Sequence, residues 1–97
     1  MGDMKSGYAY NDYFHTVTTT DAWVKYEFQN DDNEKFAAGV IMMRCDSANA
    51  ALFSYTGINA HGQLNQNETV TQDKVRSCIY FKSAVPSNPA SVRLMAW

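Results

Sequence analysis

Ser91-Val92-Arg93-Leu94-Met95-Ala96-Trp97 is the stretch of sequence that decides the fold. Apolar side chains alternate with other side chains along it, which predicts a β-strand with one buried face. Terminal residues fray unless something holds them in place. We therefore expect this strand to be docked, with Trp97 packed either within the fold or across a subunit boundary.

Further strand patterns precede it at residues 13–20, 23–28, 50–55 and 75–82. The first is rich in threonine and aromatic residues, which favour strands. The second alternates, with Val24, Tyr26 and Phe28 on one face. In the last, the side expected to face a core consists of Val75, Ser77, Ile79 and Phe81.

Residues 36–45 form the longest apolar stretch, and periodicity alone fits either a buried strand or a short helix there. Gly39 and the strand-rich surroundings favour a strand. Residues 46–49 have the composition of a turn. We therefore predict a β-hairpin that joins 36–45 to 50–55.

Polar segments separate these strands. Residues 29–35 predict an exposed loop, Pro86 and Pro89 predict another, and residues 58–72 predict a long surface excursion with a weak strand signal at 68–71. Short strands between turns are typical of an all-β fold, here a single antiparallel β-sandwich that could have a jelly-roll-like strand order. Residues 1–12 are polar and aperiodic and predict an extended N-terminal arm, and residues 13–97 predict the β-sandwich domain.

Composition narrows the class of protein. A chain of 97 residues has the size of one domain, and its 19% of charged residues suits a protein with much of its surface in contacts. The net charge is −2 and the basic residues are scattered, so we expect no nucleic-acid partner. We expect no membrane span and no secretory leader either, and hence folding in a cytoplasm with Cys45 and Cys78 as free thiols.

Residue types that carry chemistry occur here without a recognisable spacing. His15 lies among threonines and His61 beside Gly62, so neither suggests a metal site. Asp31, Asp32 and Glu34 fit no calcium-loop pattern. No nucleophile motif or phosphate-binding glycine loop is present. We therefore expect no enzyme activity, no cofactor and no catalytic or metal-binding residue.

The aromatic residues are the remaining candidates for function. Tyr and Trp anchor protein interfaces because they bury a large area with few rotatable bonds. We expect Trp23 and Tyr55 to pack in the core. For Tyr8 and Tyr10, in the arm, interface anchoring and simple disorder are both open.

Several segments together resemble small β-sandwich structural proteins of tailed bacteriophage virions, of the capsid decoration or cement type. They are the polar N-terminal arm, the threonine-rich first strand, the turn Asp46-Ser47-Ala48-Asn49-Ala50-Ala51, and residues 75–83 and 90–97. The resemblance implies a non-enzymatic virion protein that binds and stabilises the assembled capsid lattice, as a homo-oligomer. Its partner would then be the major capsid protein or another virion protein.

Under this hypothesis the arm would contact the lattice and the last strand would contact neighbouring subunits. The lattice contacts would be Tyr8, Tyr10 and Tyr13, and the subunit contacts would be Arg93 and Trp97. Two alternatives stay open. One is a carbohydrate- or receptor-binding module that uses Trp23, Tyr55 and His61, and the other is a tail or connector component.

Overall fold

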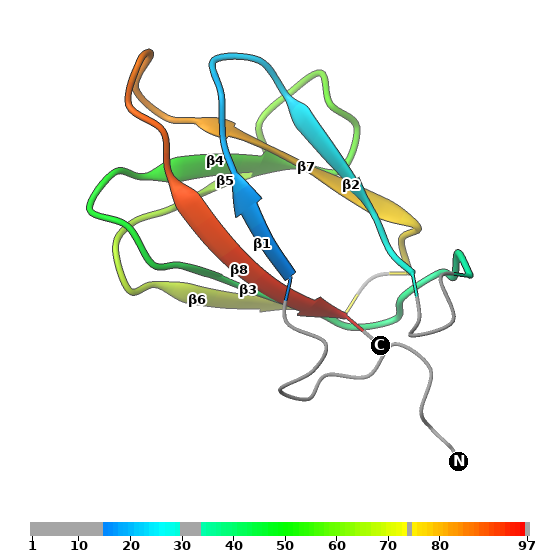
Figure 1. Ribbon diagram of the computed structural model, residues 1–97. Helices are drawn as coiled ribbons and strands as arrows, with labels where there is room; N and C mark the ends of the chain where they lie inside the picture. Colours follow the sequence, from blue (N-terminus) through cyan, green and yellow to red (C-terminus); the bar gives the residue numbers. More distant parts are fainter. Residues whose placement is uncertain (1–14, 30–33, 74, 97) are drawn as a thin grey trace.

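The computed structural model describes residues 15–29, 34–73 and 75–96, which form two antiparallel sheets of four strands each (Figure 1). The strands are β1 (His15–Thr18), β2 (Val24–Glu27), β3 (Ile41–Cys45), β4 (Ala51–Ser54), β5 (Gly62–Leu64), β6 (Thr69–Gln72), β7 (Cys78–Ser83) and β8 (Ser91–Ala96). The predicted all-β sandwich is confirmed. Among these described residues, no helix is long and apolar enough to cross a membrane. The proposed arm, Tyr13 and Trp97 lie outside them.

The strand order is that of a jelly roll. The first sheet has the order β1-β8-β3-β6 and the second has the order β2-β7-β4-β5. The pairs are nested, since β4 pairs with β5, β3 with β6, β2 with β7 and β1 with β8. Successive pairs lie in alternate sheets, as in a long hairpin that is rolled into two layers. This is the jelly-roll arrangement of eight strands.

The core lies between the sheets and follows the alternation of each strand. In β8, Val92 and Leu94 are at most 1% exposed, while Arg93 and Met95, which alternate with them, are only partly buried. The strand predicted from alternation at 91–97 is thereby confirmed over its described part. The main contributors to the core from the other strands are Val17, Ile41, Met43, Cys45, Ala51, Phe53, Leu64, Ile79 and Phe81. Both cysteines are free thiols, as expected, with Cys45 buried and Cys78 half-buried.

The predicted hairpin between 36–45 and 50–55 is wrong. Residues 41–45 do form a strand rather than a helix, but β3 belongs to the first sheet and β4 to the second. The intervening turn crosses between the layers. Two hydrogen bonds hold it near the start of β8: Asp46 N donates to Ser91 O at 2.9 Å, and Asn49 Nδ2 donates to Pro89 O at 2.9 Å. Turn residues predict a reversal of the chain, but they do not say which sheet the chain enters next.

The surface excursion predicted at 58–72 contains two strands, of which only β6 had a sequence signal. Leu64 of β5 is completely buried, and Gly62 lies so close to Phe53 that a Cβ there would come within 2.4 Å of the ring. Asn67, with φ of 66°, turns the chain from β5 into β6. Pairing with β4 rather than local pattern makes β5 a strand.

The strand predicted at 75–82 begins later than expected. Val75 is 67% exposed and Ser77 is also exposed, whereas Ile79, Phe81 and Ser83 face the core. Arg76 forms an isolated bridge with Ala38, outside the regular pairing of β7 with β2 and β4. In β2, the predicted alternation of Val24, Tyr26 and Phe28 toward the core is confirmed.

Two buried hydroxyl groups join the sheets where the chain first crosses between them. Thr19, directly after β1, places Oγ1 at 2.8 Å from Ser83 Oγ at the end of β7. The same Oγ1 accepts a hydrogen bond of 2.8 Å from Ala90 N. Buried polar groups left without partners cost free energy, so this arrangement stabilises the crossing only while it is complete.

We predict that Thr19→Val lowers the free energy of unfolding by about 2 to 4 kcal/mol, because Ser83 Oγ and Ala90 N both lose a partner. Chemical denaturation of the purified variant measures this. The matched control is Thr18→Val, which makes the same chemical change at an exposed neighbour and should stay within about 0.5 kcal/mol of the original protein. Equal losses in both variants would contradict the prediction.

Candidate functional site

The outer face of the first sheet carries an apolar groove beside a pair of arginines. Its floor and walls come from Met42 and Arg44 of β3, Arg93 and Met95 of β8, and Thr69 of β6. In the register of β3 with β8, Met42 lies opposite Met95 and Arg44 lies opposite Arg93. The groove has a volume of about 200 Å³. We call these five residues the Met-Arg face.

The two arginines are held by a shared carboxylate. Like charges directly opposite one another on paired strands repel, and Asp46 lies where it can offset this. Arg93 Nε is 2.9 Å from Asp46 Oδ2, and Arg44 Nε is 3.1 Å from Asp46 Oδ1. Arg44 also donates from Nη2 to Asn67 Oδ1 at 3.2 Å. The guanidinium groups are thereby fixed in orientation although their side chains are about 40% exposed.

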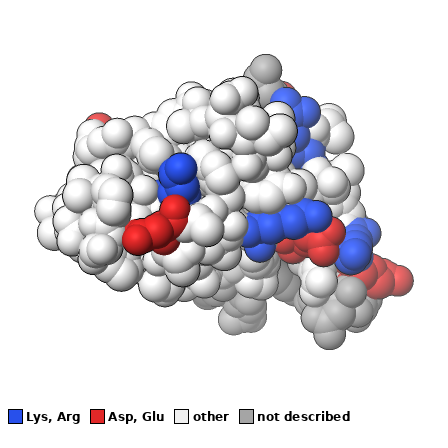
Figure 2. All heavy atoms as spheres, turned by 90° about the horizontal axis from the view of Figure 1, so that it is seen from above, with Lys and Arg blue, Asp and Glu red and all other residues white. Residues whose placement is uncertain are grey.

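Charged side chains gather on and beside the Met-Arg face. Among the described residues, Arg44 and Arg93 line the groove and Asp46 holds both of them. The view in Figure 2 shows acidic and basic side chains next to one another, with wide uncharged areas between them. Elsewhere in the described chain, Glu27 lies within 3.6 Å of Lys25 and 3.4 Å of Lys35, and these ammonium groups, Lys35 first, lower the pKa of its carboxyl.

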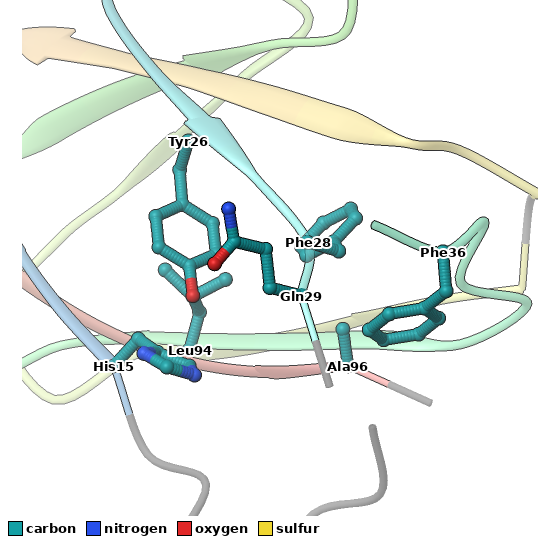
Figure 3. Close-up of a pocket in the computed structure, with 7 residues that line it drawn as sticks. All are labelled: His15, Tyr26, Phe28, Gln29, Phe36, Leu94 and Ala96. Carbon is teal, nitrogen blue, oxygen red and sulfur yellow. The ribbon is translucent and has the colours of Figure 1, made fainter. Parts of the chain in front are cut away.

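A second hollow lies at one end of the sandwich, between β1, β2 and β8 (Figure 3). Polar groups of His15, Tyr26 and Gln29 meet apolar side chains there, with Phe28, Phe36, Leu94 and Ala96 completing the lining. The His15 and Tyr26 rings are 5.1 Å apart. The hollow encloses about 10 Å³, which is about the space that one water molecule needs. It is a packing defect at the edge of the core rather than a ligand site.

Burial shifts the two titratable groups of this hollow in opposite directions. Desolvation lowers the pKa of His15, because the imidazolium is poorly hydrated there. Desolvation raises the pKa of Tyr26 to about 12, because the phenolate is also poorly hydrated there. Both groups are therefore uncharged in the folded protein near neutral pH.

One of the interface residues predicted from the sequence, Arg93, lies among the described residues, and it belongs to the Met-Arg face. Tyr8, Tyr10, Tyr13 and Trp97 lie outside the described residues. The other members of the face were missed. Met42 and Arg44 belong to a continuous apolar run whose two sides the sequence did not separate, and Asp46 was taken only as a turn residue.

The residues proposed for carbohydrate binding do not come together. Trp23 precedes β2, while Tyr55 and His61 follow β4, and these two strands run parallel because each is antiparallel to β7. Val24 and Phe53 lie opposite the same residue, Phe81, so Trp23 is level with Leu52, at the start of a strand that β7 separates from β4. Tyr55 packs against the core as expected, with His61 at a ring distance of 5.3 Å and the Arg76 guanidinium 4.9 Å from its ring centroid. Trp23 is half-buried outside the core, with Lys82 Nζ 4.9 Å from its ring centroid.

No group of three or more residues that could hold a metal ion occurs within residues 15–29, 34–73 and 75–96. Asp31 and Asp32 lie outside these ranges, and Glu34 is exposed. The chain matches no protein-family model, no curated protein and no solved structure.

We predict that the protein loses stability as the pH falls below about 6.5, the ordinary pKa of histidine. The pKa of His15 is lower in the folded protein than in the unfolded chain, so the unfolded chain takes up the proton at a higher pH. The loss begins near the unfolded pKa and ends below the folded one. Urea unfolding between about pH 7.5 and about pH 5 measures it.

His15→Gln is the control, since it removes the titrating group. The decrease in stability over this range should be smaller in the variant than in the original protein. An identical pH dependence in both proteins would show that other groups cause it.

Proposed function

We propose that this chain is a non-enzymatic structural protein of a virus particle, a capsid decoration protein that binds and stabilises the assembled capsid lattice. The observation that carries the proposal is the Met-Arg face, a groove with a pair of methionines beside a pair of oriented arginines on the outer side of the first sheet. Methionine and arginine are both enriched at protein interfaces. The docking surface is therefore this face.

The physical properties of the face support docking to a protein. Methionine side chains adapt their shape to a partner surface because they are unbranched and polarizable. Arginine supplies several directional donors, and here Asp46 has already restricted its rotamers before a partner arrives. A preorganised side chain loses less entropy on binding. Many copies on a symmetric lattice would add avidity to a modest single contact.

The fold is consistent with this role but does not decide it. Jelly rolls occur in viral capsid proteins, and also in lectins and cupins, so fold alone does not imply function. In the same proposal, Tyr8, Tyr10 and Tyr13 contact the capsid lattice and Trp97 contacts neighbouring copies in a homo-oligomer. Arg93, which the sequence predicted as a subunit contact, is assigned here to the docking face instead. A tail or connector component would use the same face and would differ only in its position on the particle.

We predict that exchanging both groove methionines for serine, Met42→Ser with Met95→Ser, weakens binding to particles that lack the protein by at least about tenfold, which corresponds to the loss of an apolar hot spot. Co-sedimentation of purified protein with such particles measures this. Leu52→Ser is the matched control, since Leu52 is a half-buried outward residue of the second sheet. It should bind as the original protein does.

Three results would contradict the proposal. The first is absence of the protein from purified particles by mass spectrometry. The second is equal binding by the methionine variant and the original protein. The third is specific glycan binding that is lost in Trp23→Ala, which would favour a carbohydrate-binding module.

A further inference from the structure

Four strands form the edges of the two sheets: β1 and β6 in the first, and β2 and β5 in the second. An edge strand exposes unpaired backbone groups, and proteins protect such edges with charged side chains, short strands or proline. Strand β2 has Lys25 and Glu27, which form an ion pair, and β5 has only three residues. Strands β1 and β6 have four residues each, none of them Lys, Arg, Asp or Glu. The first sheet therefore has the less protected edges.

These two edges differ in how well their inward side chains are covered. Val17 of β1 is only 7% exposed and belongs to the core. Val70 of β6 packs against the same core but is only partly buried. A further strand beside β6 would remove more of the Val70 side chain from water, which is favourable for an apolar group. Of the two edges, β6 therefore gains more from an added strand.

The pairing of β6 with β3 shows which backbone groups are directed outward. Cys45 N donates to Glu68 O at 3.2 Å, in the same register as the rest of this pairing. Backbone groups of successive residues in an antiparallel strand point to opposite sides. Val70 therefore directs its N–H and C=O toward β3, while Thr69 and Thr71 direct theirs away from it. Both threonines are exposed, and each offers one donor and one acceptor to a new strand.

We propose that β6 pairs with β6 of a second copy of this chain, antiparallel and about a two-fold axis at Val70. On each side of the axis, Thr69 of one copy then lies opposite Thr71 of the other, and these pairs exchange backbone hydrogen bonds. The two Val70 side chains meet in a non-hydrogen-bonded pair, where side chains are closest. The first sheets of the two copies join into one continuous sheet. This contact is distinct from the one proposed for Trp97 and does not depend on docking to a particle.

Self-complementarity favours a second copy over a different partner. An interface about a two-fold axis brings the same residues together from both copies, so they must match one another. Threonine pairs across antiparallel strands are favourable, and like charges directly opposite one another are not. In this register Glu68 lies opposite Gln72 of the other copy, and Asp73 lies opposite Asn67. Within residues 67–73, all of which the structure describes, no like charges are brought opposite one another.

The small size of this contact sets the affinity that we expect. One added strand buries less than the roughly 1,200 Å² of a standard stable interface, so the dimer should dissociate with a Kd between about 1 μM and about 1 mM. Analytical ultracentrifugation of the purified full-length protein over this concentration range should show a monomer in exchange with a dimer. A protein that stays monomeric at about 1 mM, or that forms open-ended larger assemblies, would overturn the inference.

Amide hydrogen exchange followed by NMR locates the contact. The amides of Thr69 and Thr71 should exchange more slowly as the protein concentration rises, because the second copy protects them. Thr16 and Thr18 are the internal control, since they direct their amides away from β8 at the other edge of the same sheet. Their exchange should not depend on concentration. Concentration-independent exchange at Thr69 and Thr71, or protection that appears at Thr16 and Thr18 instead, would contradict the proposal.

Charge variants test the register. Thr69→Glu with Thr71→Glu places carboxylates opposite one another on each side of the axis and should weaken the dimer by at least about tenfold. Thr69→Glu with Thr71→Lys places opposite charges there and should keep the Kd within about threefold of the original value. Both variants make the same change opposite Arg44 of β3, and circular dichroism checks that both are folded. Equal weakening in the two variants would rule out pairing about Val70.

Discussion

The alternation of side chains along β8 is the constraint on which both sides of this molecule depend. Val92, Leu94 and Ala96 point into the core, and Arg93 and Met95 point outward onto the Met-Arg face. Because β8 pairs with β1 on one side and β3 on the other, its register also sets that of its neighbours. A slip by one residue would exchange the two sets of side chains. Core formation thus fixes the outward positions of the arginine and the methionine.

Asp46 connects the path of the chain to the properties of the face. Its backbone N–H bonds to Ser91 O at the start of β8, where the chain leaves β3 for the other sheet. Its carboxylate holds Arg44 and Arg93. The same residue therefore helps direct the crossing between layers and orients the two arginines, so the proposed docking surface is built into the fold.

The sequence predicted those features that depend on local alternation. The strands around Tyr26, Ile79 and Leu94 have period-two patterns, and all three occur in the structure. The hairpin prediction failed because the turn at 46–49 marks a reversal without specifying a sheet. Strand β5 was missed because Leu64 is its one large apolar residue and its partner β4 is what makes it a strand.

The residues of the candidate site were harder to predict from the sequence than the strands, again because local patterns do not show which strands pair. Arg93 was predicted as a contact because it belongs to the alternating last strand, whereas Met42 belongs to the apolar run before Cys45, whose two sides the sequence did not separate. Outward and inward methionines are identical in sequence, and only the pairing of β3 with β8 separates Met42 from Met43. The cluster of Arg44, Arg93 and Asp46 depends on a contact between residues 47 positions apart, which no local pattern encodes.

A density map of the protein bound to its particle, at a resolution that shows side chains, tests the central claim most directly. The account predicts that Met42 and Met95 lie under a neighbouring protein chain of the particle. A map in which the outer face of the β1-β8-β3-β6 sheet is open to solvent, with the particle contacted through another surface, would contradict it.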